Sequence, residues 1–443
     1  METTLAAENR DTSRATALAQ IVVRCMECGR QYDGVTPRTA CTECGGLLDV
    51  VVPLNSLTPD DLGRGVPEAA RNSGVWRYWP LLPQLPGDAI VSRWEGNTAL
   101  YRDDRLARFA GLQDGALRMK HEGQNPTGSF KDRGMTVGVS HAKAVGAKII
   151  ACASTGNTSA SLASYAAAAG IPALVLVPAT KISAGKIAQT IAYGAKVVQI
   201  DGDFDRALAL LRELTAAYDV YLVNSVNPFR LEGQKTIMFE LLEQLDWQAP
   251  DWIALPGGNL GNTSAFGKAL AELHQVGLID RIPRLAVIQA AGAAPFAHYF
   301  QSGFEEYEAV HADTVATAIK IGDPASTPRA RRSIDVTRGW ATTVTDDEIL
   351  EAKALIDGVG IGCEPASAAS LAGLKKLRAE GVILPEHTAV GLLTGNILKD
   401  TDAVTTYHFE NVDGAPRAAA NRPLRVAAEL TALEQALSDA LHG

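Results

Sequence analysis

The sequence has no excess of positive charge. It contains 41 lysine and arginine residues against 50 acidic ones, so its formal net charge is −9 at pH 7. Proteins that bind nucleic acids usually carry a basic stripe that faces the phosphates. This balance argues against a nucleic-acid partner, and no basic amphipathic helix indicates binding to a membrane surface.

Long hydrophobic runs are also missing. Residues 1–20 are polar and lack the apolar segment of a secretory signal. The most apolar stretch, residues 160–178, is interrupted by a Gly-Ile-Pro turn at 170–172, which favours a helix, a turn and a buried strand over a membrane span. We therefore expect a cytoplasmic protein. Its 443 residues, 47% of them hydrophobic, suffice for at least one large core.

Cysteine is scarce, and its six copies do not indicate a disulfide framework in a chain without a secretory signal. Four of them form two Cys-x2-Cys pairs, with twelve residues between the pairs. Such pairs place four thiolates around one tetrahedral ion, for which zinc is the usual metal. We predict a structural zinc ribbon with the ligands Cys25, Cys28, Cys41 and Cys44, because four thiolates leave no open position for catalysis. The alternative is a set of four free thiols.

The sequence does contain a series of short runs rich in β-branched and other apolar residues, separated by segments of helical period. These runs lie at 148–154, 173–178, 196–200, 220–224, 252–256, 284–290 and 388–394. They are apolar on both alternating faces, as expected for parallel strands that helices cover on both sides. The predicted fold class is therefore α/β, with open, mostly parallel sheets.

Several of these runs end in loops of glycine and small polar residues, at 154–159, 257–263 and 393–396. Ligands of open parallel sheets bind beyond the carboxyl ends of the strands. Another loop, Asn125-Pro-Thr-Gly-Ser-Phe-Lys131-Asp-Arg-Gly134, sets one lysine among hydroxyl groups and glycines. A partly desolvated lysine can form a Schiff base, although Thr127 and Ser129 would also suit a plain helix cap. A Schiff-base lysine together with a glycine-rich phosphate loop suggests pyridoxal phosphate.

The chain resembles the threonine synthase family, within the tryptophan-synthase-β-like class of pyridoxal-phosphate enzymes of fold type II. The resemblance runs from about residue 20 to residue 405, with its motifs in order. The matching segments are Glu95-Gly-Asn-Thr98, 125–134, 154–159, Asn224-Ser-Val-Asn-Pro-Phe-Arg-Leu-Glu-Gly-Gln-Lys235, 257–262, 289–295, 318–322 and Leu393-Thr-Gly-Asn-Ile-Leu-Lys-Asp400.

By that resemblance, Lys131 is the catalytic residue and forms the Schiff base with pyridoxal 5′-phosphate. Phe130 packs near the cofactor ring, Asn157 bonds to the phenolic oxygen of the ring, and Thr394 faces its pyridine nitrogen. The residues expected to hold the cofactor phosphate are Gly257, Gly258, Asn259, Leu260, Gly261 and Asn262.

The resemblance also implies the substrate, O-phospho-L-homoserine, which loses phosphate from its γ-carbon and gains water at its β-carbon to give L-threonine. The leaving phosphate needs a second anion site, and arginine suits phosphate because its donors are planar and permanently charged. The residues predicted for this site are Asn224, Ser225, Asn227 and Arg230. Further substrate contacts are predicted from Ser154, Thr155 and Thr158. For Arg230, the alternative is a salt bridge to Glu232 or another acid.

The resemblance implies two α/β domains with the cofactor in the cleft between them. We expect a homodimer. The predicted divisions are a flexible tail (1–20), a zinc-ribbon-like module (21–50), a large cofactor-binding domain (51–115 and 226–415), a smaller mobile domain (116–225), and a C-terminal helix and tail (416–443). The helix of that last segment is expected at about 423–441.

Two details depart from the family pattern. Ala99 stands where proline is common, and Asn396-Ile397 replaces a common His-Gly pair. Three other functions stay open: a threonine or serine dehydratase, a cysteate-synthase-like enzyme, and a non-catalytic metal-binding interaction protein. A dehydratase would need no phosphate pocket around Arg230, and an interaction protein would have no chemical need for Lys131.

Overall fold

The computed structural model describes residues 14–179, 184–202, 204–412 and 414–442. Residues 1–13 of the predicted N-terminal tail lie outside the described part. The chain divides into two units, residues 1–399 and residues 400–443, and each unit is considered by itself.

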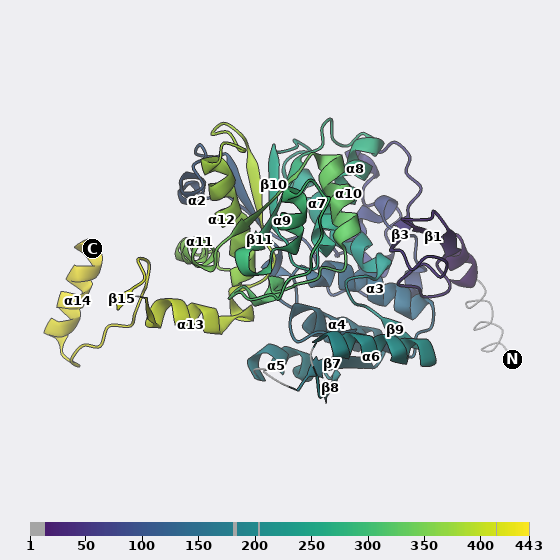
Figure 1. Cartoon of the computed structure of the whole chain (residues 1–443), viewed down its shortest axis with the longest axis horizontal. Coiled ribbons are helices and arrows are strands. Elements are labelled where there is room, and N and C mark those ends of the chain that lie inside the picture. The colour runs from purple at the N-terminus through teal and green to yellow at the C-terminus, as the bar shows by residue number, and fades with distance from the viewer. Residues whose placement is uncertain (1–13, 180–183, 203, 413, 443) are drawn as a thin grey trace. The chain divides into compact units, whose positions relative to one another are not determined.

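The elements follow one another in a largely alternating order of strands and helices (Figure 1). The strands are β1 (Val22–Cys25), β2 (Gln31–Asp33), β3 (Leu48–Val51), β4 (Leu100–Tyr101), β5 (Leu117–His121), β6 (Ile149–Ala153), β7 (Ala173–Pro178), β8 (Lys196–Ile200), β9 (Val220–Leu222), β10 (Trp252–Pro256), β11 (Arg284–Ala290), β12 (Trp340–Val344), β13 (Ala389–Leu393), β14 (Asn411–Val412) and β15 (Ala415–Pro416). The helices are α2 (Asp104–Phe109), α3 (Lys131–Ala144), α4 (Asn157–Ala169), α5 (Ala184–Ala192), α6 (Phe204–Ala217), α7 (Pro228–Gln244), α8 (Gly261–Val276), α9 (Pro295–Gln301), α10 (Thr327–Thr337), α11 (Asp346–Gly358), α12 (Pro365–Ala379), α13 (Thr401–Phe409) and α14 (Leu430–His442).

Short 3₁₀ turns complete the set. They are η1 (Pro59–Asp61), η2 (Glu68–Ala70), η3 (Trp76–Leu81), η4 (Gly87–Ala89), η5 (Glu122–Gln124), η6 (Ala291–Ala293), η7 (Thr317–Ile319) and η8 (Ile397–Lys399).

Two open sheets carry the fold, which confirms the predicted α/β class. The larger has the strand order β12-β11-β10-β13-β5-β4, and the smaller has the order β8-β7-β6-β9. All pairings in them are parallel except that of the two-residue edge strand β4 with β5. Each of the seven apolar runs in the sequence contains one of these strands. Strand β5 lies in the larger sheet although the sequence assigns residues 116–225 to the smaller domain, and the division into domains stays a prediction.

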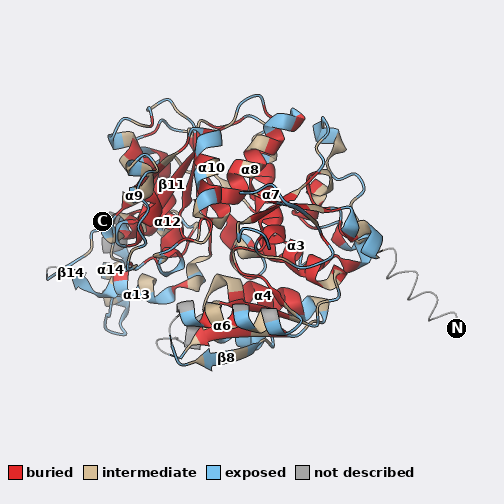
Figure 2. Ribbon diagram, turned by 45° about the vertical axis from the view of Figure 1, so that its right-hand side comes forward, coloured by how far each residue is buried: buried red, intermediate tan, exposed pale blue. Residues whose placement is uncertain are grey.

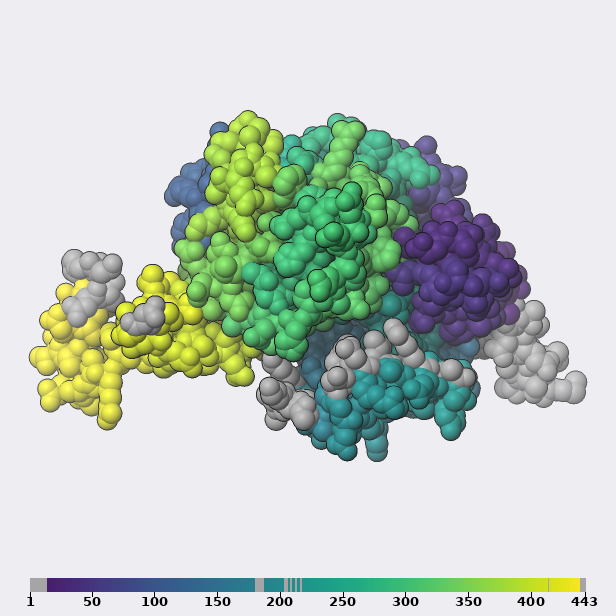
Figure 3. All heavy atoms as spheres, in the orientation of Figure 1, coloured from purple at the N-terminus to yellow at the C-terminus, as the bar shows by residue number. Residues whose placement is uncertain are grey.

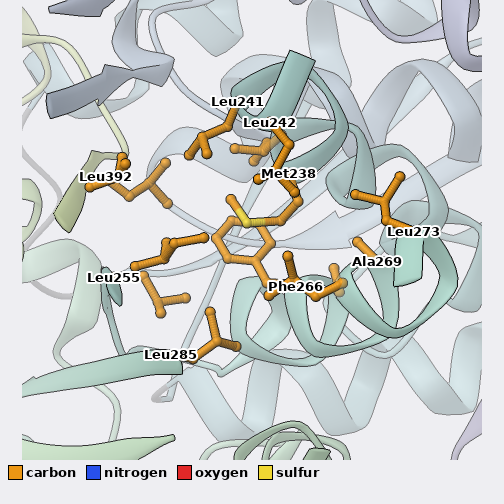
Figure 4. Close-up of a cluster of buried hydrophobic side chains, with 14 of the residues drawn as sticks. Met238, Leu241, Leu242, Leu255, Phe266, Ala269, Leu273, Leu285 and Leu392 are labelled. Atoms are coloured by element: carbon orange, nitrogen blue, oxygen red, sulfur yellow. The ribbon is translucent and has the colours of Figure 1, made fainter. Parts of the chain in front are cut away.

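Alternate residues of the central strands pack on opposite sides of the larger sheet. Ile253 and Leu255 of β10 belong to a core shared with α7 and α8, whereas Trp252 and Ala254 of the same strand belong to a core shared with α12. Period-two alternation with both faces buried is what a covered parallel strand requires. Figure 2 shows that the inward faces of these helices are buried. Figure 4 shows part of the first core, where Phe266 and Met238 meet leucines of the helices and strands, among them Leu255, Leu285 and Leu392.

The N-terminal strands form a separate antiparallel sheet of order β2-β1-β3, the predicted ribbon. It packs beside α10 and α3 (Figures 1 and 3). Lys268 Nζ of α8 donates to the carbonyl of Val50 at 2.5 Å. From α3, His141 Nε2 lies 2.7 Å from the carbonyl oxygen of Gly34. Three helices of the main body therefore hold the ribbon, since Arg332 of α10 also pairs with Asp49 at 2.7 Å.

The second unit contains α13, the short β14–β15 hairpin and α14. The predicted C-terminal helix is present, but it begins at Leu430 rather than near residue 423. Its leucines Leu430, Leu433 and Leu437 are 72%, 56% and 61% exposed. Across the described residues, no helix is long and apolar enough to cross a membrane.

Candidate active site

Lys131 is the first residue of α3, and the end of the central strand β13 fixes the loop that precedes it. The backbone N–H of Phe130 donates to the carbonyl of Thr394 at 3.0 Å, and that of Asn396 donates to the carbonyl of Gly128 at 2.9 Å. The Lys131 Nζ atom lies 4.0 Å from the centre of the Phe130 ring. The structure therefore brings together Lys131, Phe130 and Thr394, three of the residues that the sequence singles out.

The surroundings of Lys131 disfavour its charged form. Burial lowers the pKa of Lys131 to about 7, nearby Arg230 acts in the same direction, and Glu364 opposes them. A lysine amine is nucleophilic only when it is neutral. Near neutral pH, a large fraction of Lys131 is thus able to attack a carbonyl group.

The two residues after Lys131 are buried in polar networks that hold the loop. The Asp132 carboxylate accepts from the N–H of Thr127 at 2.7 Å and from the hydroxyl of Ser161 on α4 at 2.5 Å. Burial raises the pKa of Asp132 to about 6. Arg133 pairs with Glu122 at 2.6 Å and with Glu240 at 2.8 Å. These contacts tie the lysine loop to α4 on one side and to α7 on the other.

Asn157 and Thr394 meet at a buried carboxylate that the sequence motifs do not single out. Asn157 Nδ2 lies 3.0 Å from Glu364 Oε2, and Thr394 Oγ1 lies 3.2 Å from Glu364 Oε1. The hydroxyl of Ser367 lies 2.9 Å from that of Thr394. Residues from α4, α12 and the end of β13 therefore form one polar edge beside Lys131.

The glycine-rich loop between β10 and α8 has the properties of an anion cradle. A side chain at Gly257 would lie 2.8 Å from Val287 Cγ1, so the position has room only for glycine. Leu260 precedes α8 with a left-handed φ of 60°, and no side chain caps the first turn of the helix. Non-glycine residues in that conformation cluster at functional sites, and an uncapped helix start offers free N–H groups to an anion.

Two buried hydroxyls at this place have no hydrogen-bond partner within the described structure, those of Thr263 and Ser326. Thr263 lies in the first turn of α8 and Ser326 precedes α10. The loop next to Ser326 contacts the cradle, because the N–H of Ala325 lies 3.5 Å from Asn259 Oδ1. Orphaned donors beside a helix start are what a bound phosphate would satisfy. The loop therefore fits the phosphate of pyridoxal phosphate.

Asn262, which the resemblance assigns to the cofactor phosphate, is hydrogen-bonded to a neighbouring helix through its side-chain oxygen. Its Oδ1 atom accepts a hydrogen bond from Gln234 Nε2 of α7 at 2.6 Å. The Gln234 side chain also packs against Gly134, where an added Cβ would lie 3.3 Å from Gln234 Cγ. Asn262 and Gln234 thus connect the cradle to the first turn of α3, three residues from Lys131.

Arg230 of α7 packs against the face of α3 that carries Lys131. Added Cβ atoms at Gly134 and Gly138 would lie 2.9 Å from the Arg230 carbonyl oxygen and from its Cγ, respectively. Positions 131, 134 and 138 are spaced to share one helix face. The guanidinium donates from Nη1 to the carbonyl of Val223 at 2.7 Å, and its buried Nε has no partner within the described residues.

The alternative partner proposed for Arg230 is occupied elsewhere. Glu232 pairs with Lys235 at 2.7 Å and with Lys268 at 2.6 Å. Burial lowers the pKa of Arg230 to about 10, so the group stays charged at neutral pH. A buried cation without a carboxylate partner in the described chain is a candidate anion site.

The other predicted substrate residues lie at the ends of β6 and β9. The amide of Asn224 binds both backbone groups of Ala153, at 3.2 and 3.3 Å, and Asn227 caps α7 and donates to the carbonyl of Leu222. Both amides are thus engaged within the protein. Ser154, Thr155, Thr158 and Ser225 are partly exposed, and no side chain caps the first turn of α4. The substrate contacts of all six residues stay predictions.

The four ribbon cysteines are close enough to share one ion. Their sulfur atoms lie within 4.8 Å of one another, with Cys25 and Cys44 at 3.5 Å and Cys28 and Cys41 at 3.6 Å. Tetrahedral zinc with bonds of about 2.3 Å would place its sulfur ligands about 3.8 Å apart, so the set fits the predicted metal. The hydroxyl of Tyr32 lies 3.1 Å from Cys41 Sγ, a neighbour that the cysteine spacing does not predict.

The comparisons with known proteins agree with this geometry. The profile of the family described as pyridoxal-phosphate dependent enzymes matches residues 91–395. Threonine synthase of Methanocaldococcus jannaschii is 44% identical over 423 residues, which cover 94% of this chain and 99% of that protein. Threonine synthase of Methanosarcina acetivorans is 48% identical over 386 residues, with coverage of 86% and 93%. The solved threonine synthase of Escherichia coli matches with a TM-score of 0.68 at 18% identity, over 95% of this chain and 100% of that one, and this likeness bears on the fold alone.

Proposed function

Because this chain belongs to the threonine synthase family of pyridoxal-phosphate dependent enzymes, we propose that it converts O-phospho-L-homoserine and water into L-threonine and inorganic phosphate. The family makes it an enzyme and, in general terms, a lyase. The proposal specifies a carbon–oxygen lyase that acts on a phosphate ester, in the last step of threonine biosynthesis.

The observation that carries the proposal is a buried arginine beside the Schiff-base lysine, which offers an anion site in addition to the cofactor cradle. An enzyme that acts on an unphosphorylated amino acid needs one phosphate site, for the cofactor. This chain has the cradle at 257–262 and, in addition, Arg230, whose buried Nε lacks a partner within the described residues. Because Arg230 of α7 packs against the face of α3 that carries Lys131, a phosphate on Arg230 would lie near the reacting carbons of a substrate held at Lys131.

The residues that would hold pyridoxal phosphate are Lys131, the cradle with Thr263, and the edge formed by Asn157 and Thr394. When bound there, the cofactor supplies an electron sink that stabilises negative charge on the substrate carbons. Lys131 moves protons: with a pKa of about 7, its amine can remove a proton from substrate carbon and return one near neutral pH.

Substrate anions would be held at two places. The guanidinium of Arg230 binds the γ-phosphate. Its positive charge also stabilises the negative charge that develops on the phosphate as the bond to the γ-carbon breaks. The uncapped first turn of α4, with Ser154, Thr155 and Thr158 around it, binds the α-carboxylate through free N–H groups. With both anions held in this way, the β- and γ-carbons would lie between Lys131 and Arg230.

We also propose that the ribbon holds one structural Zn²⁺ and that the enzyme is a homodimer. Metal analysis of the purified protein should give one zinc per chain, and replacing the four cysteines with serine should abolish it. Sedimentation equilibrium measures the dimer directly, and a monomer mass at all concentrations would contradict that part of the proposal.

The proposal is tested by measuring phosphate release and threonine formation from O-phosphohomoserine, beside O-phosphoserine, threonine and serine. The expected result is threonine from phosphohomoserine alone, with no turnover by Lys131→Ala. Dehydration of free threonine or serine would identify a dehydratase. Sulfite-dependent turnover of phosphoserine would identify a cysteate-synthase-like enzyme. Without turnover and without a visible absorbance band from bound cofactor, the interaction-protein interpretation would replace the proposal.

A further inference from the structure

Glu364 is hydrogen-bonded to the two polar side chains that are assigned to the cofactor ring. It precedes α12 and is 4% exposed. Its carboxylate accepts from Asn157 Nδ2 at 3.0 Å and from Thr394 Oγ1 at 3.2 Å. The family resemblance assigns the same amide to the phenolic oxygen of the ring and the same hydroxyl to its pyridine nitrogen. The Thr394 hydroxyl has a single proton, so Glu364 and the cofactor compete for it, whereas the Asn157 amide has two N–H groups and gives up at most one of them.

The direction of the Thr394 hydroxyl follows from its neighbours. Ser367 Oγ accepts from the backbone N–H groups of Thr394 at 2.8 Å and of Gly395 at 3.0 Å. With both lone pairs used, Ser367 can only donate its own proton, and its partner is Thr394 Oγ1 at 2.9 Å. The Thr394 proton then points to Glu364. In this hydrogen-bond pattern, the Glu364 carboxylate therefore accepts the only O–H that Thr394 can donate.

Glu364 has little room to move away from these partners. A Cβ atom at Gly395 would lie 2.4 Å from Glu364 Cδ, and the N–H of Glu364 donates to the carbonyl of Gly395 at 3.1 Å. The charged groups that act on it are Lys131 of α3 and Lys399 of η8, and the adjacent buried thiol of Cys363 is uncharged because burial raises its pKa. Lys399 is itself engaged with Gln189 Oε1 at 2.6 Å.

Loss of the Thr394 proton would leave the buried carboxylate with the Asn157 amide alone as its side-chain donor within the described residues. Such a group is costly in its charged form and becomes protonated instead. Burial already raises the pKa of Glu364, while Asn157, Lys399, Thr394 and Lys131 oppose that rise. When the cofactor takes the Thr394 hydroxyl and one N–H of Asn157, the opposing contact from Thr394 is removed and that from Asn157 is weakened, so the pKa of Glu364 rises further.

We propose that Glu364 is a positioning residue that keeps Asn157 and Thr394 in place while the site is without cofactor, and that it takes up one proton from solvent when the cofactor binds. The proton converts the carboxylate into a neutral acid, and the Thr394 O–H is released to the ring nitrogen. The inference rests on the family's cofactor and not on the proposed substrate, so it holds for another substrate too.

The test measures the affinity of 4′-deoxypyridoxine 5′-phosphate, a cofactor analogue without the carbonyl, by titration calorimetry between about pH 6 and pH 9. This probe forms no Schiff base, so the titration of Lys131 as a nucleophile does not contribute, and no turnover is needed. The matched variant is Glu364→Gln, which has the same shape but carries no proton-dependent charge. The probe's own ionisation is common to both proteins and cancels in their ratio.

We expect the dissociation constant of wild type, divided by that of Glu364→Gln, to rise by up to about tenfold per pH unit, as uptake of one proton requires. Calorimetry in buffers of different ionisation enthalpy should show about one more proton taken up by wild type. A ratio that does not change with pH, or equal proton uptake, would overturn the proposal.

Two further variants test whether the result with Glu364→Gln could come from misfolding of that variant. Glu364→Ala also lacks the carboxylate, so its ratio with wild type should change with pH in the same direction. Asp132→Asn removes another buried carboxylate, one residue from Lys131, whose donors are Thr127 and Ser161 and are not assigned to the cofactor. This control should keep the pH dependence of wild type. Loss of that dependence in Asp132→Asn would assign the proton to Asp132 and overturn the proposal.

Discussion

Replacing Arg230 with methionine is expected to impair turnover and, at the same time, to stabilise the protein without ligands. The two effects have one cause. Arg230 is 2% exposed, its Nε atom has no partner in the described part of the chain, and burial lowers its pKa to about 10. The folded protein therefore bears the cost of a buried cation, and we infer that the substrate phosphate offsets that cost when it binds.

The size of each effect follows from the contacts. The fall in pKa amounts to roughly 3 kcal/mol, at about 1.4 kcal/mol per pKa unit. Methionine would remove this cost but also the hydrogen bond to Val223, worth about 1 kcal/mol, so stability should rise by about 2 kcal/mol. A charged hydrogen bond to phosphate contributes about 1.5–3 kcal/mol, and loss of one or two would lower kcat/KM on the order of 10- to 10⁴-fold.

Urea unfolding of the cofactor-free protein measures the first effect, and phosphate release from O-phosphohomoserine measures the second. Arg230→Lys, which keeps the charge, should recover part of the activity. The matched control is Arg329→Met, because Arg329 is also fully buried with a pKa lowered to about 10, but its charge partner is Asp49 of the ribbon. That variant should leave the KM for phosphohomoserine unchanged. A destabilised Arg230→Met protein with kcat/KM within a few-fold of wild type would refute the reasoning.

Three further predictions follow from the same structure. Burial lowers the pKa of His141 to about 4 in the folded protein. The resulting stability, roughly 3 kcal/mol, is present at pH values above the ordinary histidine pKa and should be lost as the pH falls through 4. Urea unfolding against pH should show this loss in wild type and a smaller one in His141→Gln. Gly395→Ala would place a Cβ atom 2.4 Å from Glu364 Cδ, so fluorescence titration should show cofactor affinity at least about tenfold weaker, and an unchanged affinity would mean that the edge can shift freely. Chelation of the ribbon metal should make all four ribbon thiols reactive towards a thiol reagent and lower the unfolding temperature, whereas full reactivity before chelation would show that no metal is bound.

The sequence predicts most strands of the two sheets because a parallel strand buried on both faces is a plain apolar run. Strand β5 escapes that pattern, since it carries Lys120, a charged residue that is fully buried. Its partner is Glu240, at 2.6 Å and 120 residues further along the chain. No local sequence pattern predicts a pair between residues so far apart in the chain. A buried strand that carries a lysine therefore has the sequence pattern of a surface segment.

The same limit applies to the candidate site. The loops of Lys131, Asn157 and Thr394 are predictable because each has its own motif of glycine and small polar residues. Glu364 is not, because a glutamate before a proline at a helix start looks like an ordinary first-turn acid. Its importance depends on Asn157, 207 residues away, and on Thr394. The Gly-Cys-Glu-Pro segment at 362–365 does follow a helix and precede an alanine-rich one, which is the only local signal.

The ribbon docks on a helix that is synthesised much later than the ribbon itself. Strand β3 leaves the ribosome early, but Arg332, the partner of Asp49, follows it 283 residues later. At about 5–20 residues per second, this interval lasts roughly 15–60 s. During that time helix α10 is not yet available to pack against the ribbon, so the ribbon must be stabilised by its own contacts. A cluster of four cysteines that closes within the first 44 residues offers a bond that is complete long before the surface it will dock on has been synthesised.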